Sequence, residues 1–101
     1  SRRTLADRLE SVPRAMPALM RSGKLQSAPH TMAQPAGGRC CSLADAAENL
    51  QTAQPASAQA EQAVGELLFA AANLARQAGV DPEQALQKAN EAFCTAAGPV
   101  A

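Results

Sequence analysis

Three cysteines and one histidine are the most reactive side chains in this 101-residue chain. Cys40, Cys41, Cys94 and His30 could together supply four zinc ligands. The paired spacing typical of zinc modules is absent, because two cysteines are adjacent and the third is distant. Adjacent cysteines also rarely form a disulfide with each other, since the bond strains the peptide between them. We therefore expect free thiols in a reducing cytoplasm, and the lack of an apolar signal region near the first residue favours the same location.

Basic side chains concentrate in the first 40 residues, which carry seven Lys and Arg against two Asp and Glu. Residues 41–101 carry two basic against seven acidic side chains. A basic segment can bind nucleic acid or another anionic surface. Here the arginines are scattered, acids interrupt them and no aromatic side chain lies between them, so nucleic-acid binding is not expected. A solvated segment that pairs with the acidic half is the preferred interpretation.

The composition limits the fold that can position these groups. Alanine accounts for 25 residues, and Leu, Val and Phe together for only 16. The chain has few of the β-branched and aromatic residues that strands favour, with no Ile, Trp or Tyr. No stretch approaches the roughly 20 consecutive apolar residues of a membrane span. Alanine favours helices but buries little area. We expect a small all-α protein without membrane contact, whose core a partner chain completes.

Proline and glycine breaks, together with helical periodicity, predict the order of the elements. The first dozen residues can form a short helix, and the four longer helices predict an up-and-down bundle with short links. Ser42 and Ser57 are the expected N-caps of the third and fourth helices. Helices are expected over about 1–12, 17–28, 43–53, 58–78 and 82–97, with a loop at 29–41.

The helix expected at 58–78 carries a continuous apolar stripe. Its members are Val64, Leu67, Leu68, Ala71, Leu74, Ala75 and Ala78. Either an intrachain core or a dimer interface explains this stripe. Gly79 is then the expected glycine after the helix end. Asp81-Pro82-Glu83-Gln84 predicts a new helix, with Asp81 as N-cap, Pro82 at the first position and Gln84 completing a capping box.

Two stretches of the chain carry longer motifs. The segment from Val64 to Phe93 contains Gly-Glu-Leu-Leu-Phe-Ala, then Asn-Leu-Ala-Arg, then a Gly-Val-Asp-Pro-Glu turn and Ala-Leu-Gln-Lys-Ala-Asn. The segment from Val12 to Gln26 contains Pro-Ala-Leu-Met-Arg and Lys-Leu-Gln. In their order along the chain, the two segments resemble the MazG family of nucleoside triphosphate pyrophosphohydrolases. The segment from Val12 to Gln26 is similar to the start of the C-terminal domain of long members.

The resemblance implies a MazG-like four-helix bundle at residues 14–97, completed by dimerisation, with a basic arm at 1–13 and a tail at 98–101. It also implies cleavage of a nucleoside triphosphate to the monophosphate and pyrophosphate with Mg²⁺. In that family, carboxylates at i and i+3 on facing helices hold the metal. The metal neutralises phosphate charge and can activate a water.

At the matching positions, the resemblance implies that Glu48 and Glu66 are the catalytic and Mg²⁺-binding carboxylates. The residues implied to contact the substrate are Asn73, Asn90, Lys88 and Arg76. Asparagine has poor propensity inside helices, which favours a function for the two asparagines. A structural hydrogen bond between helices would explain them equally well.

Other family positions are replaced in this chain. The acidic motif Glu-Glu-x-x-Glu reads Glu48-Asn49-Leu50-Gln51-Thr52, Ala63 stands in place of a second-motif Glu, and Ala92 replaces a Lys. Asp45, three residues before Glu48, offers an alternative acidic pair. Two carboxylates bind Mg²⁺ weakly, so hydrolysis is expected to be weak or lost. The alternatives are a non-catalytic helical module that dimerises or binds a nucleotide or protein, and a decayed fragment without a function.

Overall fold

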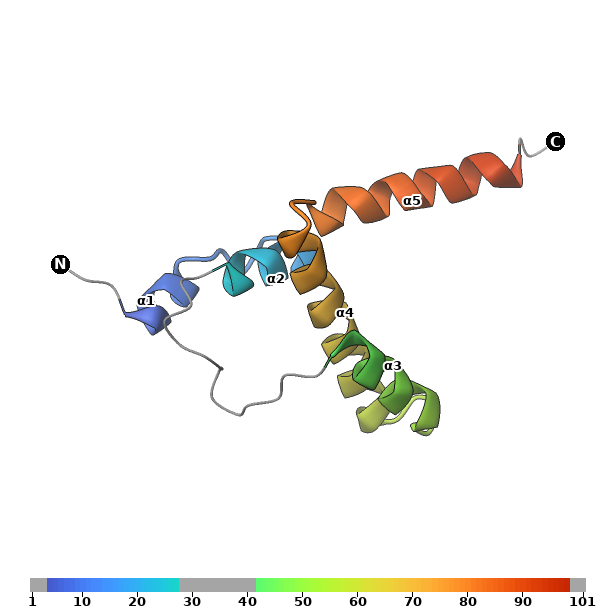
Figure 1. Cartoon of the computed structure of the whole chain (residues 1–101), viewed down its shortest axis with the longest axis horizontal. Helices are drawn as coiled ribbons and strands as arrows, with labels where there is room; N and C mark the ends of the chain where they lie inside the picture. The colour runs from blue at the N-terminus through green and yellow to red at the C-terminus, as the bar shows by residue number, and fades with distance from the viewer. Residues whose placement is uncertain (1–3, 28–41, 99–101) are drawn as a thin grey trace.

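The computed structural model describes residues 4–27 and 42–98, which contain five α-helices and no strand (Figure 1). The helices are α1 (Leu5–Glu10), α2 (Ala18–Gln26), α3 (Leu43–Thr52), α4 (Ala58–Gln77) and α5 (Pro82–Ala97). The all-α class predicted from composition is confirmed. The expected loop at 29–41, with His30, Cys40 and Cys41, lies outside the described residues.

Polar side chains begin three helices where the sequence predicts them. The hydroxyl of Ser42 accepts a hydrogen bond from the backbone N–H of Asp45 at 3.1 Å, and Ser57 caps α4 in the same way. Asp81 caps α5 by accepting from the backbone N–H of Glu83 at 3.0 Å. Each cap satisfies an N–H group that has no partner within its helix.

The capping box predicted for α5 is not formed in the described part of the chain, because Asp81 bonds to the second residue of the helix and Gln84 does not bond back. A reciprocal capping box occurs instead at α1. There the Asp7 backbone N–H donates to the Thr4 hydroxyl at 3.0 Å, and the Thr4 backbone N–H donates to the Asp7 carboxylate at 3.2 Å.

Helix α4 ends as predicted, at a glycine in the left-handed region. Gly79 has φ +74°, and its N–H donates to the Arg76 carbonyl at 3.0 Å. The N–H of Val80 donates to the Ala75 carbonyl at 2.9 Å. These two bonds form a Schellman motif, which satisfies the last carbonyls of α4 and redirects the chain into α5.

Helix α4 is the centre of packing (Figure 1). Helix α3 lies along its N-terminal part and α2 lies near its C-terminal part. The side-chain amide of Gln26 on α2 donates to the Phe69 carbonyl of α4 at 3.1 Å. The fully buried residues of the described part are all small: Ala46, Ala63 and Ala72. Small side chains let the helices approach closely but remove little apolar area from water.

Helix α5 projects away from the end of α4 (Figure 1). Pro82 and Glu83 are half-buried, but residues 84–97 are all exposed, and Phe93 is 77% exposed. The Cα radius of gyration is 16.4 Å, whereas a compact domain of this length has about 13 Å. Among the described residues, α5 therefore does not pack against α2, α3 and α4 to close a four-helix bundle. In the described residues, no helix is long and apolar enough to cross a membrane.

Candidate functional site

The two candidate carboxylates, Glu48 and Glu66, lie on neighbouring helices but in different surroundings. Glu48 is exposed on α3 and follows the fully buried Ala46 by two residues, which is about 200° around the helix. It therefore lies on the face of α3 opposite the packed one. Glu66 is half-buried on α4, and its carboxylate accepts a hydrogen bond from Gln62 at 3.1 Å. Within a single chain, Glu66 therefore lies closer than Glu48 to the packed face of its helix.

The described residues include no group of three or more His, Cys, Asp or Glu side chains that could hold a metal ion. Mg²⁺ demands octahedral oxygen coordination, and proteins usually supply one or two carboxylates while substrate phosphates and waters supply the rest. Residues 4–27 and 42–98 therefore do not provide a magnesium cage made of protein ligands alone. Glu66 could add one ligand to a cation that arrives with a triphosphate.

Asn73 and Arg76 form a hydrogen-bonded pair on α4, three residues apart and both half-buried. The Arg76 Nε and Nη2 groups donate to the Asn73 Oδ1 at 3.2 and 2.9 Å. The pair gives Asn73 a structural role within its own helix, where the sequence offered a bond between helices as the alternative to substrate binding. The pair also holds the guanidinium in a fixed orientation, which suits it to contact a phosphate.

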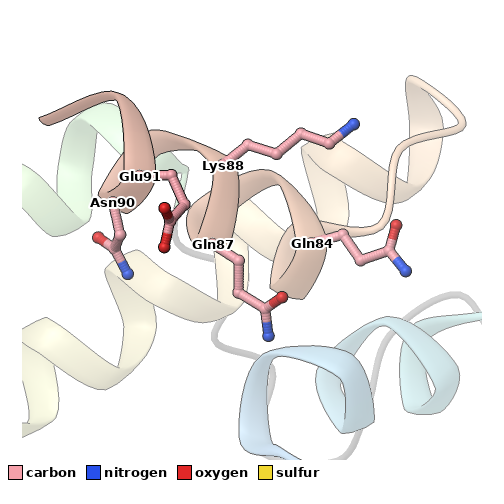
Figure 2. Close-up of a pocket in the computed structure, with 5 residues that line it drawn as sticks. All are labelled: Gln84, Gln87, Lys88, Asn90 and Glu91. Atoms are coloured by element: carbon pink, nitrogen blue, oxygen red, sulfur yellow. The ribbon is translucent and has the colours of Figure 1, made fainter. Parts of the chain in front are cut away.

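Lys88 and Asn90 lie on α5, around a surface hollow of about 450 Å³ (Figure 2). Its other lining residues are Gln84, Gln87 and Glu91. Figure 2 shows Lys88 extending away from Gln87 and Asn90. All five side chains come from one helix, so the hollow is an open surface rather than a cleft that encloses a nucleotide.

The predicted site residues therefore fall into two groups, on α3–α4 and on α5. The α5 hollow includes no side chain from α3 or α4. A single site built from Glu48, Glu66, Asn73 and Asn90 would therefore need an arrangement beyond the single chain.

A second hollow, of about 530 Å³, lies between α1 and α2 and was missed at the sequence level. Its charged lining residues are Glu10, Arg14 and Arg21. From the sequence alone, these arginines are expected to be scattered, solvated charges. The signal available was their position on either side of Pro17, in a segment where two prolines turn the chain between short helices.

Comparison with known proteins finds a partial relative. No family model matches the chain, and no solved structure matches it. The nucleoside triphosphate pyrophosphohydrolases of Escherichia coli K12 and O157:H7 are each 39% identical to it over 94 residues, which cover 84% of this chain. The same alignment covers 35% of each relative, so the chain spans about a third of their length. The resemblance predicted from the motifs is thereby confirmed: this chain is homologous to one part of the MazG-type nucleoside triphosphate pyrophosphohydrolase.

Proposed function

We propose that the chain is a MazG-type pyrophosphohydrolase-like domain, one that binds nucleoside triphosphates as a homodimer and whose Mg²⁺-dependent hydrolysis is weak or lost. Homology to the E. coli enzymes supports the substrate class. The observation that carries the loss of activity is the burial of Ala63, which is only 3% exposed. The family has a glutamate at this position, so a metal-binding position has become a packing contact.

The residual chemistry that this chain could perform depends on its own side chains. In the reaction, the oxygen of a water bonds to phosphorus while the bridging P–O bond between the α and β phosphates breaks. Glu66 is the candidate base for the proton of that water. Arg76, Lys88 and the side-chain amides of Asn73 and Asn90 are the candidates to bind phosphate oxygens. With so few carboxylates, Mg²⁺ binding is expected to be weak or absent.

Homodimerisation is supported by apolar side chains that the single chain leaves uncovered. On α4, Val64, Leu68 and Leu74 are 39%, 47% and 50% exposed. On α5, Leu86 and Phe93 are 46% and 77% exposed. Soluble monomers seldom leave so many large apolar side chains uncovered around so small a core. A second copy that covers these faces could also bring the α5 residues of one chain toward the α4 residues of the other.

Pyrophosphate release is the experiment that tests the proposal. Wild type, Glu66→Ala and Glu61→Ala are incubated with ribo- and deoxynucleoside triphosphates and Mg²⁺ or Mn²⁺. Glu61 is exposed on the first turn of α4, five residues from Glu66 and about 140° around the helix, so it serves as the matched control. We expect wild-type turnover far below the ~1–1000 s⁻¹ of ordinary enzymes, and any release to disappear in Glu66→Ala only.

Binding without hydrolysis is the second arm. A non-hydrolysable triphosphate analogue should bind the wild type, and Lys88→Gln should weaken that binding. Ordinary turnover that Glu66→Ala abolishes would overturn the proposed loss of activity. Failure to bind any nucleotide would favour the non-catalytic dimerisation module instead, which the burial of Ala63 also supports.

A further inference from the structure

The hollow between α1 and α2 combines an apolar wall with charged side chains. Its apolar lining residues are Leu9, Val12 and Leu25, all half-buried. Its volume is about 530 Å³. None of the residues assigned above to nucleotide hydrolysis lines it.

Arg21 carries the strongest indication that this hollow binds a ligand. It lies in the first half of α2 and is half-buried. Its Nε is buried and has no hydrogen-bond partner among the residues that the structure describes. Buried donors are nearly always paired, because an unpaired one loses its bonds to water without compensation. Arg76 shows the contrast, since its Nε is satisfied by Asn73.

Arg14 and Glu10 complete the charged part of the hollow. Both are exposed, and in residues 4–27 neither forms an ion pair with Arg21 or with each other. Arg14 lies in the turn closed by the Met16 N–H and the Pro13 carbonyl at 3.4 Å. Two guanidinium groups against one carboxylate leave the hollow with a net positive charge.

We propose that this hollow binds a phosphate monoester. Arg21 and Arg14 donate to the phosphate oxygens, since the planar guanidinium matches phosphate in a two-point contact. The apolar wall of Leu9, Val12 and Leu25 contacts the organic part of the ester. Bound phosphate accepts from the terminal N–H groups of Arg21, whose buried Nε has no acceptor among the described residues. Glu10 opposes anion binding and limits the affinity.

The test uses the arginine side-chain Nε–H signals in the NMR spectrum of the full chain, without metal or nucleoside triphosphate. Phenyl phosphate, inorganic phosphate and benzoate are titrated in turn. We expect the Arg21 signal to shift saturably, with phenyl phosphate binding tighter than inorganic phosphate because of the apolar wall. Benzoate, a carboxylate with the same ring, should bind more weakly. The Arg8 signal should not move, since Arg8 is exposed on α1 and does not line the hollow.

Three variants distinguish specific phosphate binding in the hollow from general attraction of an anion to positive charge. Arg14→Gln should weaken phenyl phosphate binding at least about tenfold, through loss of a charged hydrogen bond. Glu10→Gln should strengthen it, and Arg8→Gln should leave it unchanged. Arg14 and Glu10 are exposed, so these variants test the proposal even where Arg21→Gln disturbs folding.

Three results would overturn the phosphate site. They are an unmoved Arg21 signal, equal losses in Arg14→Gln and Arg8→Gln, and benzoate binding as tight as phenyl phosphate. None of these results depends on pyrophosphate release, so failure of this site and failure of the proposed function are distinguishable.

Discussion

Helices α4 and α5 both carry apolar residues at helical spacing, but only α4 is packed within the chain. Helix α4 contributes two of the fully buried residues of the described part, Ala63 and Ala72. Helix α5 is exposed from Gln84 to its end, and its largest side chain, Phe93, is 77% exposed. The difference shows that the buried side chains of the described part are alanines, while several larger apolar side chains remain exposed in the single chain.

Size explains this division. Alanine lets α2 and α3 approach α4 closely, and each alanine buries only a small apolar area. A longer side chain at these positions would not fit between the helices. Phe93 and Leu86 need a broad apolar surface opposite them, and α5 meets the other helices only near its start (Figure 1). In the proposed homodimer, a second copy would supply such a surface through the exposed residues of α4.

The largest expected effect comes from placing a charge in the packed region. Ala63→Glu restores the family's acid, but at a position that is 3% exposed. We expect a loss of roughly 2–4 kcal/mol in the free energy of unfolding, because the carboxylate is buried without a partner. Urea denaturation measures the change, and Ala92→Glu on exposed α5 is the control. A stable Ala63→Glu variant with raised pyrophosphate release would contradict the assignment of Ala63 to packing.

The next prediction concerns the exposed apolar side chains of α5, Leu86 and Phe93. Phe93→Asp should raise the dimer dissociation constant at least about 30-fold, as loss of a buried aromatic anchor does. The far-ultraviolet circular dichroism should change little, since Phe93 is 77% exposed in the single chain. Sedimentation equilibrium measures the dissociation constant, with Ala92→Asp, about 100° around the helix from Phe93, as the control. Equal constants for wild type and Phe93→Asp would place the interface elsewhere.

A smaller effect is expected at the start of α5. Asp81 accepts from the Glu83 N–H at 3.0 Å, and Asp81→Ala should cost about 1 kcal/mol through loss of the N-cap. Because α5 has few contacts with the rest of the chain, the loss should appear as fraying of α5. Hydrogen exchange of the first-turn amides measures it, and Asp81→Asn, which keeps an oxygen acceptor, should restore protection. No difference between the two variants would contradict a capping role.

The smallest prediction tests the turn between α3 and α4. Ala56 has φ +60° at the third position of a turn that the Ser57 N–H and the Gln54 carbonyl close at 3.2 Å. Ala56→Gly removes the strain of a Cβ in this region and should stabilise the fold by up to about 1 kcal/mol. Ala92→Gly, inside α5, should have the opposite sign. Thermal denaturation compares the stability of the two variants. A loss of stability in Ala56→Gly would contradict the claim that Ala56 is strained.

Much of the fold was predictable because local signals determine helix ends. Ser42, Ser57, Gly79 and Asp81 act as predicted, since caps depend on residues within one turn of one another. The uncovered state of α5 was not predictable in the same way. Periodicity identifies an apolar face but does not say which chain covers it.

Among the site residues, too, features that depend on local spacing were predictable, and features that depend on the arrangement of helices were not. The pairing of Asn73 with Arg76 follows from their spacing of three residues on a helix. The exposed position of Glu48 also follows from spacing, because α3 buries Ala46 two residues earlier. The hollow at Arg14 and Arg21 depends on how prolines orient two short helices, which residue types alone do not determine.

Hydrogen exchange of the α5 amides at low and high protein concentration tests the central claim most directly. If a second copy covers α5, protection of residues 86–97 should rise with concentration, while protection of α3 and α4 at their packed alanines changes little. Protection of α5 that is high at every concentration would show that it packs within its own chain. Protection that stays low at every concentration would show that no second copy covers it, and either result would contradict the account.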